Sequence, residues 1–225
     1  MDLNTLKSGL IVSCQAPAES PLHEPMIIAA IAFSCVNHGA VGVRIDSPSH
    51  VESVRQQLPD TPIIGLWKRH YPDCEVYITP RLDDGIKIAS SGADIIAIDA
   101  TLRKRPHDET MSNIIEGIHK QYGKLVMADV DSIDSAKAAV KAGADMVGTT
   151  LYGYTKETEH LTPPGLGLLE EMAQILDVPI ICEGGIATPE QAKKALELGA
   201  FAVVVGTAIT GIDLKTQAFK AVFPV

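Results

Sequence analysis

The chain has 225 residues, of which 46% are hydrophobic but only 4% aromatic, and its formal net charge is −9. This length suits one domain of barrel size or two small ones, and the aliphatic composition suits a core of Val, Ile and Leu. The acidic balance argues against nucleic acid or an anionic membrane surface as a partner, and no apolar run approaches the roughly 20 residues of a membrane span.

Apolar runs and helical stretches alternate along the whole chain. The expected strands are residues 9–14, 41–45, 62–68, 94–99, 125–129, 145–150, 179–183 and 201–205. The expected helices are residues 25–37, 49–58, 83–90, 107–122, 133–141, 165–176, 189–198 and 214–223. The strands are almost continuously apolar, which is typical of parallel strands that are buried on both faces.

Four of these strands follow the same dipeptide, Gly-Ala, which begins at Gly39, Gly92, Gly143 and Gly199. Each interval between the copies holds a second apolar run, so the chain contains four two-strand units. Eight strands in this pattern predict a single (β/α)8 TIM barrel over residues 1–225, with a doubly wound open sheet as the alternative. No shift in composition marks a second domain.

In such a barrel the active site lies at the C-terminal ends of the strands. Almost every expected strand ends on a polar residue, and surface exposure alone explains about half of such positions. Polar groups converging from so many strands indicate a site. They are Gln15, Arg44, Lys68, Asp99, Asp129, Thr149 with Thr150, Glu183, and Gly206 with Thr207.

The last two of these strands run into glycine-containing turns, Glu183-Gly184-Gly185 and Gly206-Thr207. Glycine lets backbone N–H groups approach an anion closely, and barrels frequently bind phosphate at these two loops. We therefore expect Gly184, Gly185, Gly206 and Thr207 to bind phosphate. The alternative is that the glycines only form tight turns.

Two of the strand-end residues are candidates for proton transfer. Lys68 ends an apolar strand, where burial and nearby cations such as Arg44 or Arg69 would lower its pKa. Alternatively, it is a solvated lysine that pairs with an acidic loop residue. Glu183 is a candidate second acid or base, a hydrogen-bond acceptor, or merely a salt-bridge partner of Lys68.

The remaining strand-end residues have open assignments. Arg44 and Asp129 are either an ion pair across the mouth or contacts to substrate oxygens, and Gln15 is a candidate for binding an amide or carbonyl. Alternation along a strand turns Cys14 and Cys182 toward the outer helices.

Neither the cysteines nor the histidines suggest a metal site. The four cysteines form no CxxC pair, and the seven histidines are scattered without metal-ligand spacing. The cysteines therefore indicate reduced thiols in a cytoplasmic protein, and the N-terminus lacks a signal-peptide pattern.

Several stretches along the chain form one joint pattern: residues 9–16, 39–44, 62–69, 98–101 with Arg105-Pro106, 127–129, 148–155, 183–186 and 206–210. Taken jointly and in order, these stretches resemble the bacterial N-acetylmannosamine-6-phosphate 2-epimerases. The resemblance runs over nearly the whole chain.

The resemblance implies a barrel isomerase of sialic acid catabolism that inverts C2 of an amino-sugar phosphate without metal or nucleotide. It makes Lys68 the catalytic acid/base with Glu183 beside it. It assigns the orientation of the substrate to Gln15, Arg44 and Asp129, and the phosphate to the backbones of Gly184, Gly185, Gly206 and Thr207. We also expect Thr149 and Tyr152 to contact the substrate. The tail from Ala218 to Val225 is apolar enough to dock on its own barrel or on a partner's, and together with the resemblance it favours a homodimer.

One departure from the family pattern concerns the phosphate. Family members often carry Arg-Pro after the Ala-Ile-Thr of the last strand, whereas this chain has Gly211-Ile212. A cationic phosphate contact is therefore expected to be missing or supplied by Lys215 or another loop. Two other functions compete on the residues alone: a Schiff-base aldolase that uses Lys68, and a regulator that only binds a sugar phosphate.

Overall fold

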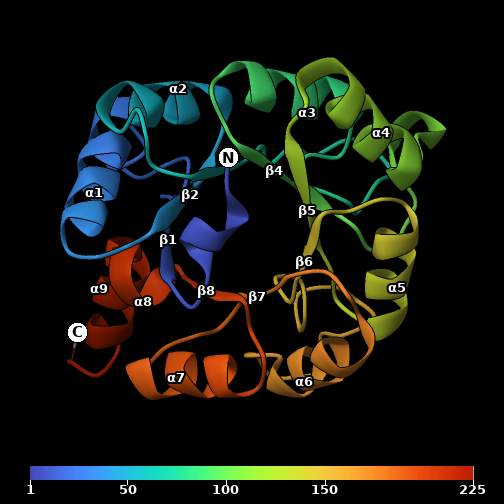
Figure 1. Ribbon diagram of the computed structural model, residues 1–225. Coiled ribbons are helices and arrows are strands. Elements are labelled where there is room, and N and C mark those ends of the chain that lie inside the picture. The colour runs from blue at the N-terminus through green and yellow to red at the C-terminus, as the bar shows by residue number, and fades with distance from the viewer. Residues whose placement is uncertain (225) are drawn as a thin grey trace.

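The computed structural model describes residues 1–224 and contains a closed barrel of eight parallel strands in the order β1 to β8. β1 pairs with both β2 and β8, so the sheet has no free edge and the open-sheet alternative is excluded. Figure 1 shows the strands as an inner ring surrounded by helices. The strands are β1 (Leu10–Cys14), β2 (Gly42–Asp46), β3 (Ile63–Leu66), β4 (Ile95–Asp99), β5 (Leu125–Asp129), β6 (Met146–Gly148), β7 (Ile180–Cys182) and β8 (Ala202–Val205).

The helices follow the strands in alternation. They are α1 (Pro25–Asn37), α2 (Pro48–Gln57), α3 (Leu82–Ser90), α4 (Met111–Tyr122), α5 (Ile133–Lys141), α6 (Leu166–Ile175), α7 (Pro189–Glu197), α8 (Thr207–Thr210) and α9 (Ile212–Lys220), with short 3₁₀ turns η1 (Leu3–Leu6) and η2 (Pro106–Asp108). Helix α4 begins four residues later than expected because Thr110 caps it, its side chain accepting a hydrogen bond from the backbone N–H of Asn113. The expected last helix, residues 214–223, corresponds to α9, which begins at Ile212 and ends at Lys220, and the short α8 before it was not expected.

The four Gly-Ala dipeptides terminate the helices that precede β2, β4, β6 and β8. Their glycines all have φ between +100° and +106°, a left-handed conformation that glycine adopts without strain. In three copies the alanine N–H bonds back to a carbonyl five residues earlier, for example Ala144 to Ala139, which is the closing bond of a Schellman motif. The repeat therefore ends each of these helices, and the chain then enters an even-numbered strand.

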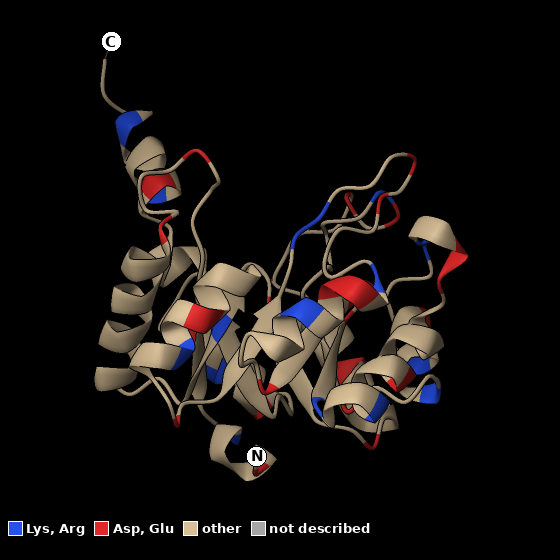
Figure 2. Ribbon diagram, turned by 90° about the horizontal axis from the view of Figure 1, so that it is seen from above, with Lys and Arg blue, Asp and Glu red and all other residues tan. Residues whose placement is uncertain are grey.

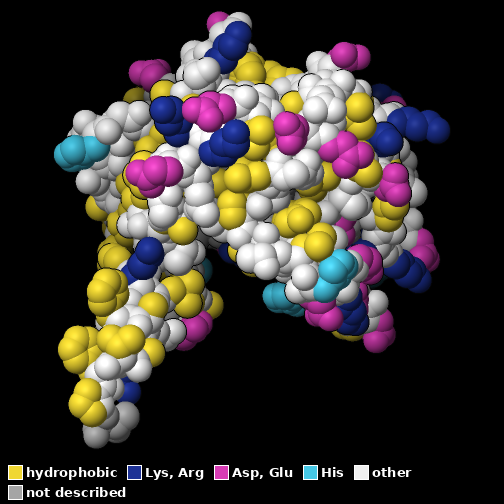
Figure 3. Space-filling view, turned by 90° about the horizontal axis from the view of Figure 1, so that it is seen from below, with side chains coloured by type: hydrophobic (Ala, Val, Ile, Leu, Met, Phe, Trp, Pro, Cys, Tyr) yellow, Lys and Arg dark blue, Asp and Glu magenta, His cyan; other side chains and the backbone are white. Residues whose placement is uncertain are grey.

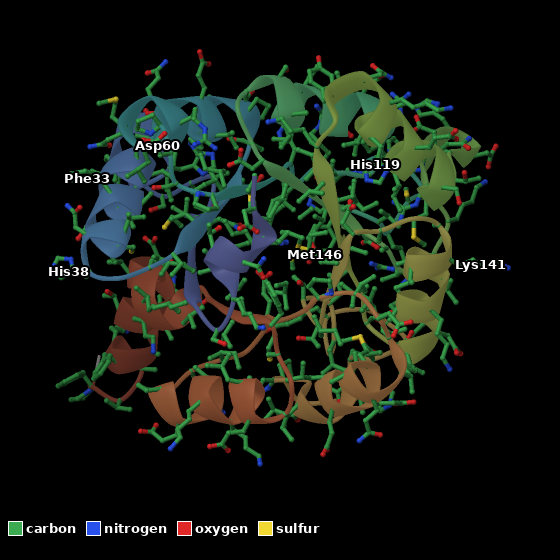
Figure 4. All side chains as sticks on the ribbon, viewed as in Figure 1. Phe33, His38, Asp60, His119, Lys141 and Met146 are labelled. Atoms are coloured by element: carbon green, nitrogen blue, oxygen red, sulfur yellow. The ribbon has the colours of Figure 1, made fainter. Side chains whose placement is uncertain are left out.

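Alternation along the strands creates two separate apolar layers. Inward side chains such as Ile64, Met127 and Val204 fill the barrel, and Leu6 of η1 closes its N-terminal end. Outward side chains pack beneath the helices, and they include Cys14 and Cys182, as expected. Figure 4 shows Met146 near the centre of the barrel and Phe33 on the outer side of α1.

The two ends of the barrel differ. Figure 2 shows η1 at one end, whereas the long loops and the C-terminal segment rise from the other. The loops after β3 and β6 are the longest irregular segments, and both leave the C-terminal ends of strands. No helix within residues 1–224 has the length and apolar character needed to cross a membrane.

Candidate active site

Above the last apolar layer, the mouth of the barrel carries a ring of polar side chains from most of the strands. The arrangement follows from alternation, because Arg44 and Asp129 each lie two residues beyond an inward-facing position of their own strand. The ring contains Gln15, Arg44, Lys68, Asp99, Asp129, Thr150 and Glu183.

Arg44 forms the floor of this mouth. Its side chain is 1% exposed and reaches across the barrel from β2. Nη2 donates to Asp129 Oδ2 at 2.6 Å, and Nη1 donates to Oδ1 at 3.3 Å. Burial alone would lower the pKa of Arg44, but the carboxylates of Asp129 and Glu183 outweigh it and raise that pKa. A permanent positive charge therefore lies beneath any ligand in the mouth.

Glu183 lies beside this guanidinium, just beyond β7. Its Oε1 is 3.1 Å from Arg44 Nε, but the N–H does not point at it, and Arg44 Nε has no hydrogen-bond partner within residues 1–224. Thr150 Oγ1 lies 3.2 Å from Oε2, and because its own proton is donated to Asp129, it can accept a hydrogen bond from the protonated form of Glu183. Burial raises the pKa of Glu183 to about 7, against the opposing effect of Arg44. Near neutral pH this carboxyl can both give and accept a proton.

Lys68 lies two residues beyond the end of β3 and faces the same space. Its Nζ donates to Gln15 Oε1 at 2.5 Å and lies 3.9 Å from Asp46 Oδ2. The side chain is 43% exposed, so Lys68 is partly desolvated rather than buried. The alternative of a Lys68–Glu183 salt bridge is also excluded in this structure, because the ion-pair partner of Glu183 is Arg44.

The structure turns Thr149 away from the mouth. Its hydroxyl donates to the Glu183 carbonyl at 2.7 Å and accepts from the Glu183 N–H at 3.0 Å, which fastens β6 to β7. The inward position belongs to Thr150, whose hydroxyl donates to Asp129 Oδ1 at 2.7 Å. The expectation that Thr149 contacts substrate missed this, although counting alternate residues from the inward Gly148 would have identified Thr150.

Tyr152 is likewise outside the mouth. Its ring packs on Gly165, at the start of α6, where an added Cβ would lie 2.8 Å from it. In the same loop, Tyr154 lies beside Gly184 and is 54% exposed. The sequence did not indicate which of the two tyrosines lies beside Gly184, because this depends on the path of an irregular loop.

The two expected phosphate loops adopt tight backbone conformations. Gly184 and Gly185 have φ of +98° and +72°, and a Cβ on Gly185 would lie 2.5 Å from a carbon of Pro163. Gly206 precedes α8, whose first residue is Thr207. Neither residues 184–187 nor residues 206–211 include a lysine or arginine. These two segments therefore offer an anion only their backbone N–H groups and hydroxyls.

A metal centre has no evident place among these residues. Within the described part of the chain, no three or more His, Cys, Asp or Glu side chains form a group that could hold a metal ion. All four cysteines are free thiols, and Cys14 and Cys182 are buried outside the barrel. The chemistry of the mouth is thus that of a lysine and a carboxyl above a buried arginine.

Comparisons with known proteins agree on one family. A family model described as "Putative N-acetylmannosamine-6-phosphate epimerase" matches residues 28–223. A relative from Synechococcus elongatus, named "Putative N-acetylmannosamine-6-phosphate 2-epimerase", is 61% identical over 218 residues, which are 96% of this chain and 94% of that protein. A relative of the same name from Listeria monocytogenes is 41% identical over 211 residues, covering 92% and 91%.

Solved structures give the same result. The N-acetylmannosamine-6-phosphate 2-epimerase from Clostridium perfringens superposes with a TM-score of 0.94 at 38% identity, covering 98% of this chain and 96% of that one. A thiamine phosphate pyrophosphorylase from Pyrococcus furiosus reaches a TM-score of 0.64 at 17% identity, a likeness of fold alone.

Proposed function

The chain belongs to the N-acetylmannosamine-6-phosphate 2-epimerase family, and from this premise we infer that it inverts C2 of N-acetylmannosamine 6-phosphate to give N-acetylglucosamine 6-phosphate. It is an isomerase acting on carbohydrates, and the family is consistent with a role in sialic acid catabolism. The observation that best supports the reaction is the placement of Lys68 and Glu183 over β3 and β7, which are four strands apart in an eight-stranded ring.

Inversion by proton transfer needs two groups on opposite faces of one carbon. The C2 hydrogen is acidic only in the open-chain sugar, where the C1 aldehyde delocalises the charge. In our proposal Lys68, in its neutral form, removes this proton, and Glu183, in its protonated form, returns one to the opposite face. The pKa of Glu183, raised to about 7, keeps a large fraction of it protonated at neutral pH.

The remaining residues of the ring hold and orient these two. Gln15 binds the Nζ of Lys68 and so fixes the direction of its lone pair. Arg44 and Asp129 form the floor on which the sugar oxygens rest, and Thr150 links Asp129 to Glu183. We propose Thr150 rather than Thr149 as the threonine nearest the substrate.

The phosphate is proposed to bind the backbone of Gly184, Gly185, Gly206 and Thr207. The positive φ of both glycines in the first loop supports this, because side chains there would obstruct the approach of an anion. The replacement of the family's Arg-Pro by Gly211-Ile212 leaves the site without that cation. Hydrogen bonds from these loops would then carry the affinity for phosphate.

We further propose that the protein is a homodimer whose interface includes α9. No residue of α9 is buried, and its apolar side chains are exposed, Phe219 at 71% and Leu214 at 52%. Figure 3 shows hydrophobic side chains gathered on the projecting C-terminal segment. The Ser20 hydroxyl donates to Asp213 at 2.9 Å, which ties α9 to the loop before α1. On α1 itself, Met26 and Phe33 are also exposed. A second copy of the chain is the occupant that we propose for this surface.

Domain organisation and cellular location complete the proposal. Residues 1–225 are proposed to act as one catalytic domain, supported by the closure of the barrel from β1 to β8. A cytoplasmic location is proposed because all four cysteines are free thiols.

The test is exchange of the C2 proton, followed by NMR in deuterated water with N-acetylmannosamine 6-phosphate as substrate. Lys68→Ala should lower exchange and epimerisation by about 10²-fold or more, because it removes a proton-transfer group. Lys87→Ala is the matched control, since Lys87 is an exposed lysine of α3 near the Trp67 ring. Exchange at the native rate in Lys68→Ala would exclude Lys68 as the base, and no exchange in the unmodified protein would exclude the proposed reaction.

A further inference from the structure

The loop after β3 returns to the mouth of the barrel and lines it with Tyr77. Lys68 and Ile78 form an antiparallel bridge, and the Arg69 N–H donates to the Tyr77 carbonyl at 2.9 Å. The Asp99 N–H donates to the Ile78 carbonyl at 2.8 Å. Tyr77 and Ile78 are therefore held between the C-terminal ends of β3 and β4.

The ring of Tyr77 is held on two sides. It packs against the apolar cluster that fills the barrel, and it stacks on His70 with ring centroids 5.9 Å apart and planes 16° from parallel. The phenol group lies among the charged side chains of the mouth, close enough to Asp99, Asp129 and Arg44 for each to affect its ionisation. Tyr77 is thus part of the polar ring, although it lies in the loop after β3 and not at the end of a strand.

The hydroxyl of Tyr77 makes no hydrogen bond to any other group of residues 1–224. Both nearby carboxylates are already occupied. Asp129 accepts from Arg44 and Thr150, and Asp99 accepts from Thr101 at 2.7 Å and from Arg103 at 2.8 Å. A donor held over the mouth without a partner is available to a ligand.

This hydroxyl stays protonated at the pH values at which enzymes work. Burial, followed by the carboxylates of Asp129 and Asp99, raises the pKa of Tyr77 to about 12. Tyr77 is therefore a neutral hydrogen-bond donor, and it does not compete with Lys68 or Glu183 for the substrate proton.

The strand order indicates which end of the sugar it meets. β4 is four strands from β8 in the closed ring, so Tyr77 lies across the mouth from the proposed phosphate loops. A hexose 6-phosphate anchored at β7 and β8 directs C1 and C2 toward β3, β4 and β5, where Lys68 and Tyr77 lie.

We propose that the Tyr77 hydroxyl donates a hydrogen bond to the C1 oxygen of the substrate and stabilises that oxygen when it becomes an enolate. This inference rests on the proposed epimerisation. When Lys68 takes the C2 proton, the C–H electron pair forms the C1–C2 double bond, and the former carbonyl pair moves onto oxygen. Reprotonation of C2 reverses these shifts, so no electrons or atoms are gained or lost overall.

Removing the hydroxyl alone tests this role. Tyr77→Phe keeps the ring that packs on the barrel core, and it should lower kcat by about 10²-fold or more, the usual effect of losing one preorganised oxyanion donor. KM should change less than about threefold, because the interaction forms mainly in the transition state. Exchange of the C2 proton in deuterated water should fall in parallel with kcat.

Tyr71→Phe is the matched control, since Tyr71 belongs to the same loop but donates to Asp84 at 3.1 Å, beside α3. Its kcat should remain within about threefold of the unmodified protein. A fall of less than about tenfold in Tyr77→Phe, or equal falls in both variants, would overturn the proposal for Tyr77. Failure of the proposed reaction would be seen separately, as an absence of C2 exchange in the unmodified protein.

Discussion

Replacing Glu183 by glutamine should make the protein more stable than the unmodified chain above pH 7. The carboxyl is buried, and burial raises its pKa from the ordinary value of 4.5 to about 7 despite the neighbouring Arg44. A carboxyl with a raised pKa favours the folded state while it is protonated, and that contribution is lost as the pH rises from 4.5 through 7. Glutamine cannot ionise, so it avoids this loss.

The size of the effect follows from the two pKa values. Each pKa unit corresponds to about 1.4 kcal/mol, so full ionisation of Glu183 costs the folded state about 3 kcal/mol. Between pH 5 and pH 8 the free energy of unfolding of the unmodified protein should fall by roughly 2 to 3 kcal/mol relative to Glu183→Gln. Arg44 keeps its ion pair with Asp129 in the variant, so no buried charge is left without a partner.

The assay is urea denaturation of both proteins at several pH values from 5 to 8. Other titrating groups cancel in the difference between the two free energies of unfolding. Glu170→Gln, at an exposed position of α6, serves as the control and should show a difference that does not vary with pH. A difference for Glu183→Gln that stays within about 0.5 kcal/mol across this range would refute the reasoning, because the carboxyl would then titrate alike in the folded and unfolded chains.

The other predictions concern the phosphate loops and the dimer. Gly185→Ala should raise KM by about tenfold or more, because a Cβ there would lie 2.5 Å from Pro163 in a backbone with φ of +72°. Steady-state kinetics measure it against Gly167→Ala, whose added Cβ has no neighbour within 4 Å, and an unchanged KM in Gly185→Ala would contradict the assigned phosphate site. Phe219→Glu should raise the dimer dissociation constant at least about tenfold, because it places a charge in an apolar interface. Sedimentation velocity measures this beside Tyr122→Glu, an exposed aromatic on α4, and an unmodified protein that remains a monomer would exclude the dimer.

Local patterns were sufficient to predict the barrel. The Gly-Ala dipeptides mark four helix ends because only glycine tolerates the left-handed conformation there, and the helix-closing bonds are made within a few residues. Strand β5 and helix α5 were predicted with their observed bounds, Leu125–Asp129 and Ile133–Lys141. Helix α4 was predicted too early, because the helical pattern extended back over His107, whose φ is +56°.

The site was predicted in part. Alternation correctly predicted that Cys14 faces outward, and an ion pair of Arg44 with Asp129, one of the two alternatives for these residues, is present. The same alternation continues beyond Gly148, where Thr150 faces inward and the expected Thr149 does not. Lys68 is only partly desolvated because the strand ends at Leu66 and the lysine side chain extends beyond it, where it is 43% exposed.

The sequence by itself determined the order of the elements, the helix stops and which strand ends carry polar groups, because each depends on residues close together in the chain. Only the tertiary structure decided that Arg44 spans the barrel to reach Asp129 and Glu183, and that Tyr77 returns over β4. Those contacts join residues far apart in sequence, and their geometry depends on closure of the barrel and on loop paths that no local pattern specifies. The raised pKa of Glu183 has the same origin, since burial exists only once all eight strands have met.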